Sequence, residues 1–342
     1  TQHSVKELRS IGIQPDILVC RSEQYINDHD KKKIALFTNV EAKAVINSID
    51  VDDIYEVPLI LHDQGLDDII VEKLKLKCNS TSLDSWKKYK TKKNSAKEKI
   101  TIKIIAKYGN YSESYKSLNE AIKHAGVHCG VNVNIDYVDA EKLDSADFSE
   151  LKNAEGVIVP GGFGDRGIEG KINSIKYCRE NKIPFLGICL GLQCAIIDFS
   201  RNICGMTDAN STEFNKQTKY PVIDLMESQK AIKIKGGTMR LGAYDCDIKV
   251  GTRIHDAFGV NKVSERHRHR YEVNNKYKNM LEKHGLIFSG INPDLKVVES
   301  IEIKNHPWYV ATQFHPELKS RVNRAHPLFR DFIKAAKNER KK

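Results

Sequence analysis

Hydrophobic residues in the second half of the chain fall into short runs that alternate with segments of helical periodicity. A short apolar run bounded by glycine or proline predicts a buried strand, whereas apolar residues spaced three or four apart predict a helix. The predicted strands are 101–106, 131–135, 156–160, 183–188 and 308–314, and the predicted helices include 115–125, closed by Gly126, and 190–199. This alternation predicts an α/β fold with a mostly parallel, doubly wound sheet.

The first part of the chain, 1–76, shows a shorter version of the same alternation. Its predicted strands are 17–20, 31–37 and 54–57, the last ended by Pro58, and its predicted helices are 40–49 and 66–76. We interpret this part as an incomplete α/β domain. The polar, lysine-rich segment 77–99 is predicted to be a linker to a second domain, 100–338, and a nucleic-acid patch is the alternative for its basic residues.

The composition limits the class of protein. A net charge of +10 allows nucleic acid or anionic ligands as partners, but the lysines are scattered or lie in the linker, and no nucleic-acid-binding motif accompanies them. We therefore expect a solvated surface and no nucleic-acid partner. The eight cysteines have irregular spacings without a C-x-x-C pair. This argues against a zinc site and a disulfide framework, and it fits a reducing cytosol.

No apolar run has the length of a membrane span, and no signal peptide is visible. We therefore expect a cytoplasmic protein without membrane association. The first residue is Thr1 rather than Met, and the chain opens on the approach to a helix with no strand before it. We expect this chain to be a fragment or a processed product of something longer.

The strongest chemical signal is Cys189, which lies between the strand 183–188 and the helix that begins at Leu190. Gly187 and Gly191 flank it, so the sequence reads G-x-C-x-G, the cysteine counterpart of a nucleophile elbow. A sharp turn of this kind leaves no room for side chains two residues before and after the nucleophile. The helix start beside the sulfur favours a thiolate. The alternative is a structural cysteine that only packs in the core. The nucleophile is the better interpretation only if a base is found elsewhere in the sequence.

The glycine loop 161–164 follows a predicted strand. It fails as a phosphate-binding loop, because Asp165 stands where that motif requires glycine. A plain tight turn and one half of an oxyanion hole remain. Because the carboxyl ends of parallel strands meet at one edge of a sheet, the loop should lie beside Cys189. We favour an oxyanion hole formed by the N–H groups of Gly162 and Leu190.

A base for Cys189 is available near the C-terminus, where the predicted strand 308–314 leads to His315. Glu317 follows two residues later and is placed to orient the imidazole ring. A lone histidine is more often structural, but here it supplies the group that the cysteine lacks. The order Cys189, His315, Glu317 predicts a triad assembled at the ends of separate strands.

Three stretches, 160–164, 187–193 and 314–317, resemble the motifs of class I (triad) glutamine amidotransferases. Four further stretches narrow the resemblance to the CTP synthase family, which hydrolyses glutamine. They are 1–13, 210–214, 236–242 and 265–274. The likeness covers nearly the whole chain. It implies that 100–338 is the glutamine amidotransferase domain and that 1–76 is the C-terminal part of a P-loop-type α/β synthase domain.

The resemblance implies that glutamine forms a thioester with Cys189, while His315 protonates the leaving ammonia and then activates water. The implied glutamine-binding residues are Gly162, Leu190, Gly191, Leu192, Gln193, Glu213 and Arg270. Arg270 suits the substrate carboxylate and Glu213 suits its ammonium group. The ammonia would then pass to the synthase domain, where ATP activates UTP for amination to CTP in pyrimidine biosynthesis.

The resemblance also implies nucleotide contacts in the first part of the chain. They are Thr1, Gln2 and Lys33 for UTP or CTP, and Ile49, Asp50 and Val51 for ATP. The half that carries the P-loop and the Mg2+ ligands is absent, so no metal ligand is expected in this chain. GTP as an allosteric activator and a homotetramer are implied for the full-length enzyme. The segment 107–115 departs from the family's lid near the glutamine site, whereas Arg166 and Glu169 match the family's separate R-G-x-E-G motif.

Three hypotheses for the function follow. The first is the C-terminal part of a CTP synthase that retains only the glutaminase half. The second is a non-catalytic regulatory module or truncated paralogue that assembles with full-length subunits. The third is another triad amidotransferase, such as the one that makes GMP, and the stretches 1–12 and 266–274 argue against it. The alternating stretch 266–270 would otherwise suggest RNA or metal binding, and a strand there would place its arginines on one face.

Overall fold

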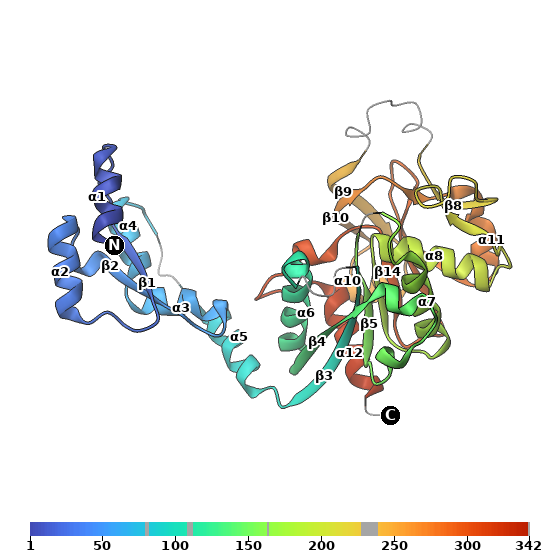
Figure 1. Cartoon of the computed structure of the whole chain (residues 1–342), viewed down its shortest axis with the longest axis horizontal. Coiled ribbons are helices and arrows are strands. Elements are labelled where there is room, and N and C mark those ends of the chain that lie inside the picture. Colours follow the sequence, from blue (N-terminus) through green and yellow to red (C-terminus); the bar gives the residue numbers. More distant parts are fainter. Residues whose placement is uncertain (79–81, 108–111, 163, 227–238, 341–342) are drawn as a thin grey trace. The chain divides into compact units, whose positions relative to one another are not determined.

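The computed structural model describes residues 1–78, 82–107, 112–162, 164–226 and 239–340. The chain divides into two compact units, Thr1–Asn94 and Ser95–Lys342, and Figure 1 shows the elements of each. The boundary falls inside the segment that is predicted to be a linker. Within the described ranges, no helix has both the length and the apolar character that crossing a bilayer requires.

The first unit contains a pair of parallel strands, β1 (Leu18–Ser22) and β2 (Val45–Ile49), with helices around them. The helices are α1 (Gln2–Ser10), α2 (Asp28–Thr38), α3 (Val57–Asp63), α4 (Leu66–Lys73) and α5 (Asp84–Ser95). The core of this unit is small and joins both strands to α2 and α4, with Cys20, Ala35, Ile46 and Ile69 buried together. The α/β character predicted for this part is confirmed.

Three predicted elements of the first unit are wrong. Residues 31–37 lie in helix α2 rather than in a strand, because Asn27 caps the helix start with its side chain. Residues 40–49 form a short 3-10 helix and then strand β2, since β-branched residues dominate the second half of this stretch. Residues 54–57 are mostly a 3-10 helix, and Pro58 lies in the first turn of α3, where its missing N–H costs no hydrogen bond.

The second unit is built on a sheet of nine strands within the described residues, in the order β10-β9-β12-β13-β14-β6-β5-β3-β4. The strands are β3 (Glu98–Ala106), β4 (Val131–Asp139), β5 (Gly156–Val159), β6 (Phe185–Ile188), β9 (Arg240–Ile248), β10 (Lys262–His269), β12 (Leu286–Ile291), β13 (Val298–Ile303) and β14 (Tyr309–Thr312). The pairs from β4 to β14 are parallel and the pairs from β14 to β10 are antiparallel. The five strands predicted for this unit are the parallel ones.

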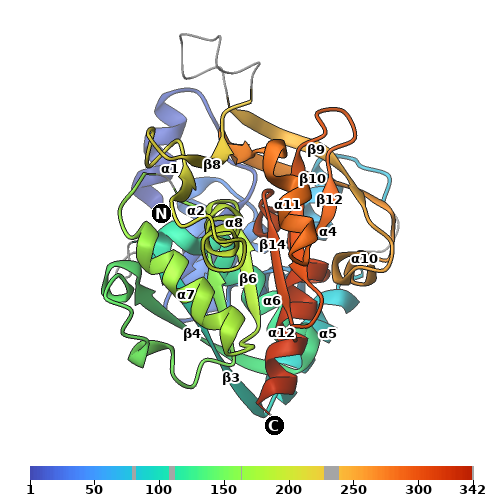
Figure 2. The same cartoon turned by 90° about the vertical axis from the view of Figure 1, so that its right-hand side faces the viewer.

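Helices cover both faces of this sheet (Figures 1 and 2). One face carries α7 (Ile168–Glu180) and α8 (Leu190–Asn202), and the other carries α6 (Lys116–Cys129), α10 (Arg253–Phe258) and α12 (Pro327–Glu339). Successive residues of one strand serve opposite cores: Val157 and Val159 pack with α7 and α8, and Ile158 packs with α12. Burial on both sides explains the continuous apolar runs in the sequence.

A smaller sheet of the described residues joins β11 (Glu272–Val273), β8 (Tyr220–Asp224) and β7 (Ala209–Ser211), and α11 (Lys278–Lys283) follows it in the chain.

Helix α6 ends later than predicted. Gly126 lies inside the helix, where a Cβ would come within 2.8 Å of Cγ2 of Val133, so glycine permits a close approach to β4. Gly130, with φ of 67°, closes the helix instead.

Helix α5 carries most of the basic run and packs within the first unit. Tyr89 is buried, and its ring centroid lies 5.4 Å from that of Tyr55. Lys90 pairs with Glu56 at 2.7 Å, and a second ion pair of 2.6 Å joins Lys93 to Asp53. Part of the basic run is therefore a helix held against the first unit by an aromatic contact and by ion pairs.

Replacing Tyr89 by Ala is expected to release α5, because the buried ring is worth roughly 3 kcal/mol. Hydrogen exchange of the backbone amides of 84–95 measures the release, and faster exchange is expected in Tyr89→Ala. Lys88 is exposed one residue away, so Lys88→Ala is the matched control. Equal protection of the helix in both variants would show that the aromatic contact does not hold it.

Candidate active site

Cys189 is the single residue between strand β6 and helix α8. Its backbone has φ of 54° and ψ of −101°, a conformation that residues with a side chain rarely adopt. A Cβ on Gly191 would lie 2.1 Å from the carbonyl oxygen of Val159, and a Cβ on Gly187 would lie 2.8 Å from the Cβ of Ala311. Only glycine fits at these two positions, which is the physical basis of the G-x-C-x-G pattern.

The nucleophile candidate is buried and is tied to the neighbouring strand. Cys189 is 4% exposed, and its backbone N–H donates to the carbonyl oxygen of Thr312 at 2.7 Å. Strands β6 and β14 are parallel, with Ile188 opposite Thr312. The N–H groups that open α8, starting at Leu190, have no acceptor within the helix and point their positive end toward this place. The position therefore suits an anion.

His315 and Glu317 lie just after the end of β14. Nδ1 of His315 and Oε1 of Glu317 are 2.7 Å apart. A Cβ built on Gly161 would lie 2.9 Å from Cε1 of His315 and 3.5 Å from Cβ of Cys189. Gly161 is thus in contact with both side chains, and the structure brings the predicted nucleophile, base and orienting carboxylate to one point.

The surroundings of His315 favour a protonated ring. Burial lowers its pKa, but the interactions with Cys189 and Glu317 outweigh burial and raise the pKa to about 10. Nε2 makes no hydrogen bond within ordinary distance and angle limits to any described residue. Contacts of this kind often tighten only when a substrate is bound. The arrangement can hold an imidazolium beside the sulfur, with its other nitrogen fixed by Glu317.

The glycine loop after β5 lies against the start of α8. A Cβ on Gly162 would come within 3.3 Å of Cδ2 of Leu190 and 3.5 Å of Nζ of Lys171. Lys171 is fully buried, and burial lowers its pKa. The backbone groups of Gly162 and Leu190 therefore belong to adjacent segments, as a two-donor oxyanion hole requires. Phe163, the next residue of the loop, lies outside the described residues.

A cavity of about 540 Å³ opens onto these groups. Its lining includes Lys107, Gly162, Cys189, Arg268 and His315. The volume is in the range of small-molecule sites in proteins. The cavity combines a nucleophile, a base and cationic side chains, which suits a small polar substrate that carries a carboxylate.

Two of the predicted glutamine contacts, Glu213 and Arg270, lie close enough to interact electrostatically near the glycine loop. Burial raises the pKa of Glu213, and a hydrogen bond from the backbone of Gly164 and the charges of Arg270 and Lys107 offset this only in part. A carboxylate and a guanidinium at this place suit the ammonium and carboxylate groups of an amino acid.

Two other predicted contacts turn their side chains inward. Leu192 is fully buried in the core on the α7 and α8 side. Gln193 is 3% exposed, and its Nε2 donates to the carbonyl oxygen of Tyr271 at 3.1 Å and to Oε1 of Gln313 at 3.3 Å. Gly191 has no side chain and abuts β5. Leu192, Gln193 and Gly191 could therefore contact a ligand only through their backbone groups at the start of α8.

The sequence reasoning misses Gln313. This residue is fully buried, and its Nε2 donates to Sγ of Cys189 at 3.7 Å. A signal was available, because Gln313 is an amide directly after the apolar run that leads to His315.

A buried group of charged residues lies beneath the site and centres on Arg240. The guanidinium contacts Glu272 at 3.1 Å and Glu299 at 2.7 Å. Burial raises the pKa of both carboxyls, to about 8 and about 7, and Arg240 opposes this shift. Burial and the charge of Arg240 lower the pKa of His267 to about 3, so its ring is neutral. Arg240 on β9 thereby joins β11 and β13 through their carboxyl groups.

The alternation expected for 266–270 is present on strand β10. Arg266 and Arg268 are exposed, while His267 and His269 are buried in the charged cluster. Arg270 follows the strand and is half-buried. The two histidines thus have structural partners. Across the described ranges, no group of three or more His, Cys, Asp or Glu residues is arranged to hold a metal ion.

The residues predicted to contact nucleotides lie in the first unit. They are Thr1, Gln2, Lys33, Ile49, Asp50 and Val51. Gln2 borders a cavity of about 590 Å³ together with the basic side chains of Lys6 and Arg9. Asp50 follows β2 and pairs with Arg21 at 2.8 Å. Thr1 and Lys33 are exposed.

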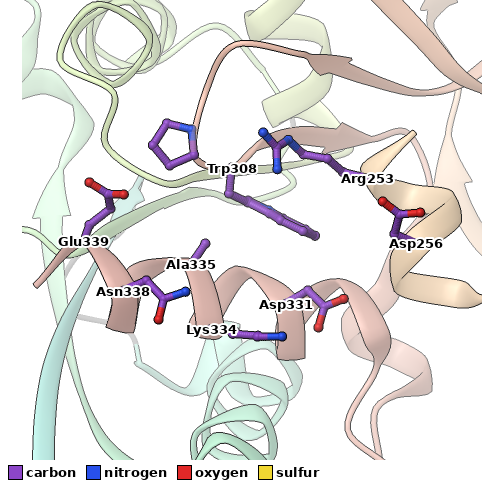
Figure 3. Close-up of a pocket in the computed structure, with 9 residues that line it drawn as sticks. Arg253, Asp256, Trp308, Asp331, Lys334, Ala335, Asn338 and Glu339 are labelled. Carbon is purple, nitrogen blue, oxygen red and sulfur yellow. The ribbon is translucent and has the colours of Figure 1, made fainter. Parts of the chain in front are cut away.

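Another cavity, of about 440 Å³, lies near the amino end of β14 (Figure 3). Trp308 directly precedes β14 and lies over helix α12, with Arg253 beside it. Because His315 follows the other end of β14, this cavity is separate from the site at Cys189. Its lining mixes acidic and basic side chains and supplies no nucleophile.

Some predicted stretches fall partly outside the described residues. They are 108–111 of the segment 107–115, and 236–238 of the stretch 236–242. The two matched residues after the glycine loop are described: Arg166 pairs with Glu141 at 2.6 Å and Glu169 pairs with Arg201 at 2.7 Å.

Comparison with known proteins agrees with the geometry. Residues 111–335 match the family model "Glutamine amidotransferase class-I", and residues 1–76 match "CTP synthase N-terminus". CTP synthase of Caldanaerobacter subterraneus is 53% identical over 339 residues, which are 99% of this chain and 63% of that protein. CTP synthase of Methanocaldococcus jannaschii is 51% identical over 347 residues, which cover 99% of this chain and 64% of that protein.

A solved structure is also similar to this chain. The glutaminase domain of Trypanosoma brucei CTPS, with bound acivicin, is 36% identical, with a TM-score of 0.65. The match covers 70% of this chain and 94% of that one. The fold, the elbow and these matches define a class I glutamine amidotransferase. Within that class, the chain belongs to the CTP synthase family, and it spans 63% of the length of the Caldanaerobacter relative.

Replacing Glu317 by Gln is expected to lower the pKa of His315, because Glu317 is one of the two groups that raise it. NMR titration of the ring resonances measures the shift. In the wild type the ring should stay protonated through neutral pH, and in Glu317→Gln it should lose its proton at lower pH. Exposed Glu282 provides the control in Glu282→Gln. The same His315 titration in all three proteins would contradict the assigned contact.

Proposed function

We propose that this chain hydrolyses glutamine through a thioester at Cys189 and, as part of a glutamine-dependent CTP synthase, supplies ammonia for the ATP-dependent amination of UTP to CTP. One observation carries the glutaminase step: Cys189, His315 and Glu317 meet beside the glycine loop at the ends of neighbouring strands. Membership of the CTP synthase family supports glutamine as the amide donor.

In the first half of the reaction, the Cys189 thiolate attacks the side-chain amide carbon of glutamine. The oxyanion that develops accepts hydrogen bonds from the N–H groups of Gly162 and Leu190. Protonated His315 gives its proton to the leaving nitrogen, so the C–N bond breaks and ammonia departs. The acyl group remains on sulfur as a thioester.

In the second half, His315 is neutral and takes a proton from the water that attacks the thioester. The C–S bond breaks, its electron pair returns to Cys189, and glutamate leaves. Glu317 accepts the hydrogen bond from Nδ1 throughout, which keeps the ring oriented and balances its charge when it is protonated. Arg270 and Glu213 hold the amino-acid end of the substrate by charge.

The synthase half of the proposal rests on family membership. Thr1, Gln2 and Lys33 are assigned to UTP or CTP, and the segment 49–51 is assigned to the ATP site. Mg2+ and ATP act in the longer enzyme, and no described cluster in this chain suits a metal, so we derive no step through Mg2+. Activation by GTP, a homotetramer and a cytoplasmic location belong to the same proposal for the full-length enzyme.

Replacing Cys189 by Ala is expected to slow glutamine hydrolysis by a factor of about 10⁴ or more, because the proposed thioester cannot form without the Cys189 sulfur. Release of ammonia and glutamate measures it, and a glutamine-like diazoketone should label wild-type Cys189 and not the variant. Cys204 is half-buried in the same unit, so Cys204→Ala is the control. Undiminished hydrolysis in Cys189→Ala would refute the nucleophile.

A wild-type chain that hydrolyses no glutamine, but that co-elutes with a full-length CTP synthase in size measurements, would favour the regulatory hypothesis instead.

Replacing Arg270 by Met or Glu213 by Gln is expected to raise the KM for glutamine roughly tenfold or more, since each change removes a charge-assisted contact. Steady-state hydrolysis measures KM and kcat, and kcat should fall less than KM rises. Arg266 is exposed on the strand that leads to Arg270, so Arg266→Met is the control for loss of positive charge. An unchanged KM in Arg270→Met would remove that residue from the substrate site.

A further inference from the structure

We propose that Gln313 is a catalytic residue that stabilises the anionic sulfur of Cys189 through a hydrogen bond from its side-chain amide. This inference rests on the proposed function, since it concerns the same nucleophile. Nε2 of Gln313 lies 3.7 Å from Sγ, and both side chains are almost wholly buried. The side chain of Gln313 thus contacts the reacting sulfur atom directly, although Gln313 belongs neither to the triad nor to the glycine loop.

The orientation of the Gln313 amide is set by a chain of donors. Its Oε1 accepts a hydrogen bond from Nε2 of Gln193 at 3.3 Å. The same Nε2 of Gln193 also donates to the carbonyl oxygen of Tyr271 at 3.1 Å, which can only accept. Gln193 must therefore present N–H groups on this side, and Gln313 must present its oxygen to Gln193 and its NH2 group to the sulfur.

The backbone holds this amide in place. The N–H of Gln313 donates to the carbonyl oxygen of Glu299 on β13 at 2.8 Å, and Glu299 is itself paired with buried Arg240. Gln313 sits directly after β14, two residues before His315. Strand β14 and its neighbours β13 and β6 therefore position Gln313, His315 and Cys189 together.

A neutral N–H donor favours the charged form of an acceptor over its neutral form. A thiolate accepts such a bond well, whereas a thiol or a thioester sulfur accepts it weakly. The hydrogen bond is therefore strongest when the sulfur is anionic. That occurs twice in each cycle: before the attack on the amide, and when the C–S bond breaks and the electron pair returns to sulfur. Gln313 assists both steps without exchanging a proton.

Charged groups also face Cys189 from the surrounding elements. His315 and Glu317 follow β14, and Lys171 projects from α7. Lys107, which directly follows β3, and Arg268 on β10 line the cavity. Each of these contributes a charge or a proton. Gln313 contributes neither, so its removal changes the stability of the anionic sulfur while the charges around it stay the same.

The test compares the pH dependence of Cys189 alkylation by iodoacetamide in wild type, Gln313→Met and Gln313→Glu, with Cys189 identified by peptide mass spectrometry. Methionine keeps the volume and removes the donor. Glutamate keeps the acceptor for Gln193 and removes the donor to sulfur. We expect the pH midpoint of alkylation to rise by about one unit in Gln313→Met, with roughly tenfold slower labelling below the midpoint, and to rise further in Gln313→Glu. The kcat for glutamine hydrolysis should fall with little change in KM.

Gln64→Met is the matched control, because Gln64 also makes hydrogen bonds through both ends of its amide but lies in the first unit. A midpoint equal to that of the wild type in either folded variant overturns the proposal, and Gln313→Glu decides the matter if Gln313→Met does not fold. If wild type hydrolyses glutamine while the midpoint stays fixed, the role of Gln313 fails and the proposed function stands. If wild type does not hydrolyse glutamine, the proposed function itself fails.

Discussion

The contact between helix α8 and strand β5 determines where the nucleophile can stand. At Gly191 the helix approaches the carbonyl oxygen of Val159 so closely that a Cβ would lie 2.1 Å away. The chain must therefore pass from strand to helix within one residue, and Cys189 takes the unusual φ of 54° that this requires. Strain of this kind persists only where surrounding packing imposes it. Here that packing consists of Gly191 against Val159 of β5 and Gly187 against Ala311 of β14, both fully buried.

The order of the strands in the sheet explains why the glycine loop, Cys189 and His315 lie close together. Because β5, β6 and β14 are parallel neighbours, their carboxyl ends lie side by side. The glycine loop follows β5, Cys189 follows β6 and His315 follows β14. Three segments that are distant in the sequence therefore lie side by side at the ends of neighbouring strands. The same close packing buries polar side chains, which then need hydrogen-bond partners inside the protein. Arg240 is paired with Glu272 and Glu299. The side chain of Gln193 donates a hydrogen bond to that of Gln313, which in turn donates to the sulfur of Cys189.

The sequence alone is sufficient to predict the parallel half of the sheet and the closeness of Cys189, His315 and Glu317, for one physical reason. Strands buried on both faces are continuous apolar runs, and the residues that follow them stand out by their glycines, cysteine and histidine. The first unit was harder to predict. The apolar residues Leu36 and Phe37 predict a strand, but both are exposed on helix α2. Pro58 predicts the end of a strand, but it lies in the first turn of helix α3. The sequence marks Gln313 only as an amide after an apolar run, and its contacts with Gln193 and Cys189 join distant segments that no local pattern reveals.

The central claim is that Cys189 carries the acyl group of glutamine as a thioester. Mixing wild-type chain with glutamine, quenching in acid during turnover and measuring peptide masses tests it most directly. The account predicts that the peptide containing Cys189 gains the mass of a γ-glutamyl group, and that the adduct is absent in Cys189→Ala. Glutamine hydrolysis that proceeds without this adduct, or with the adduct on another residue, would contradict it.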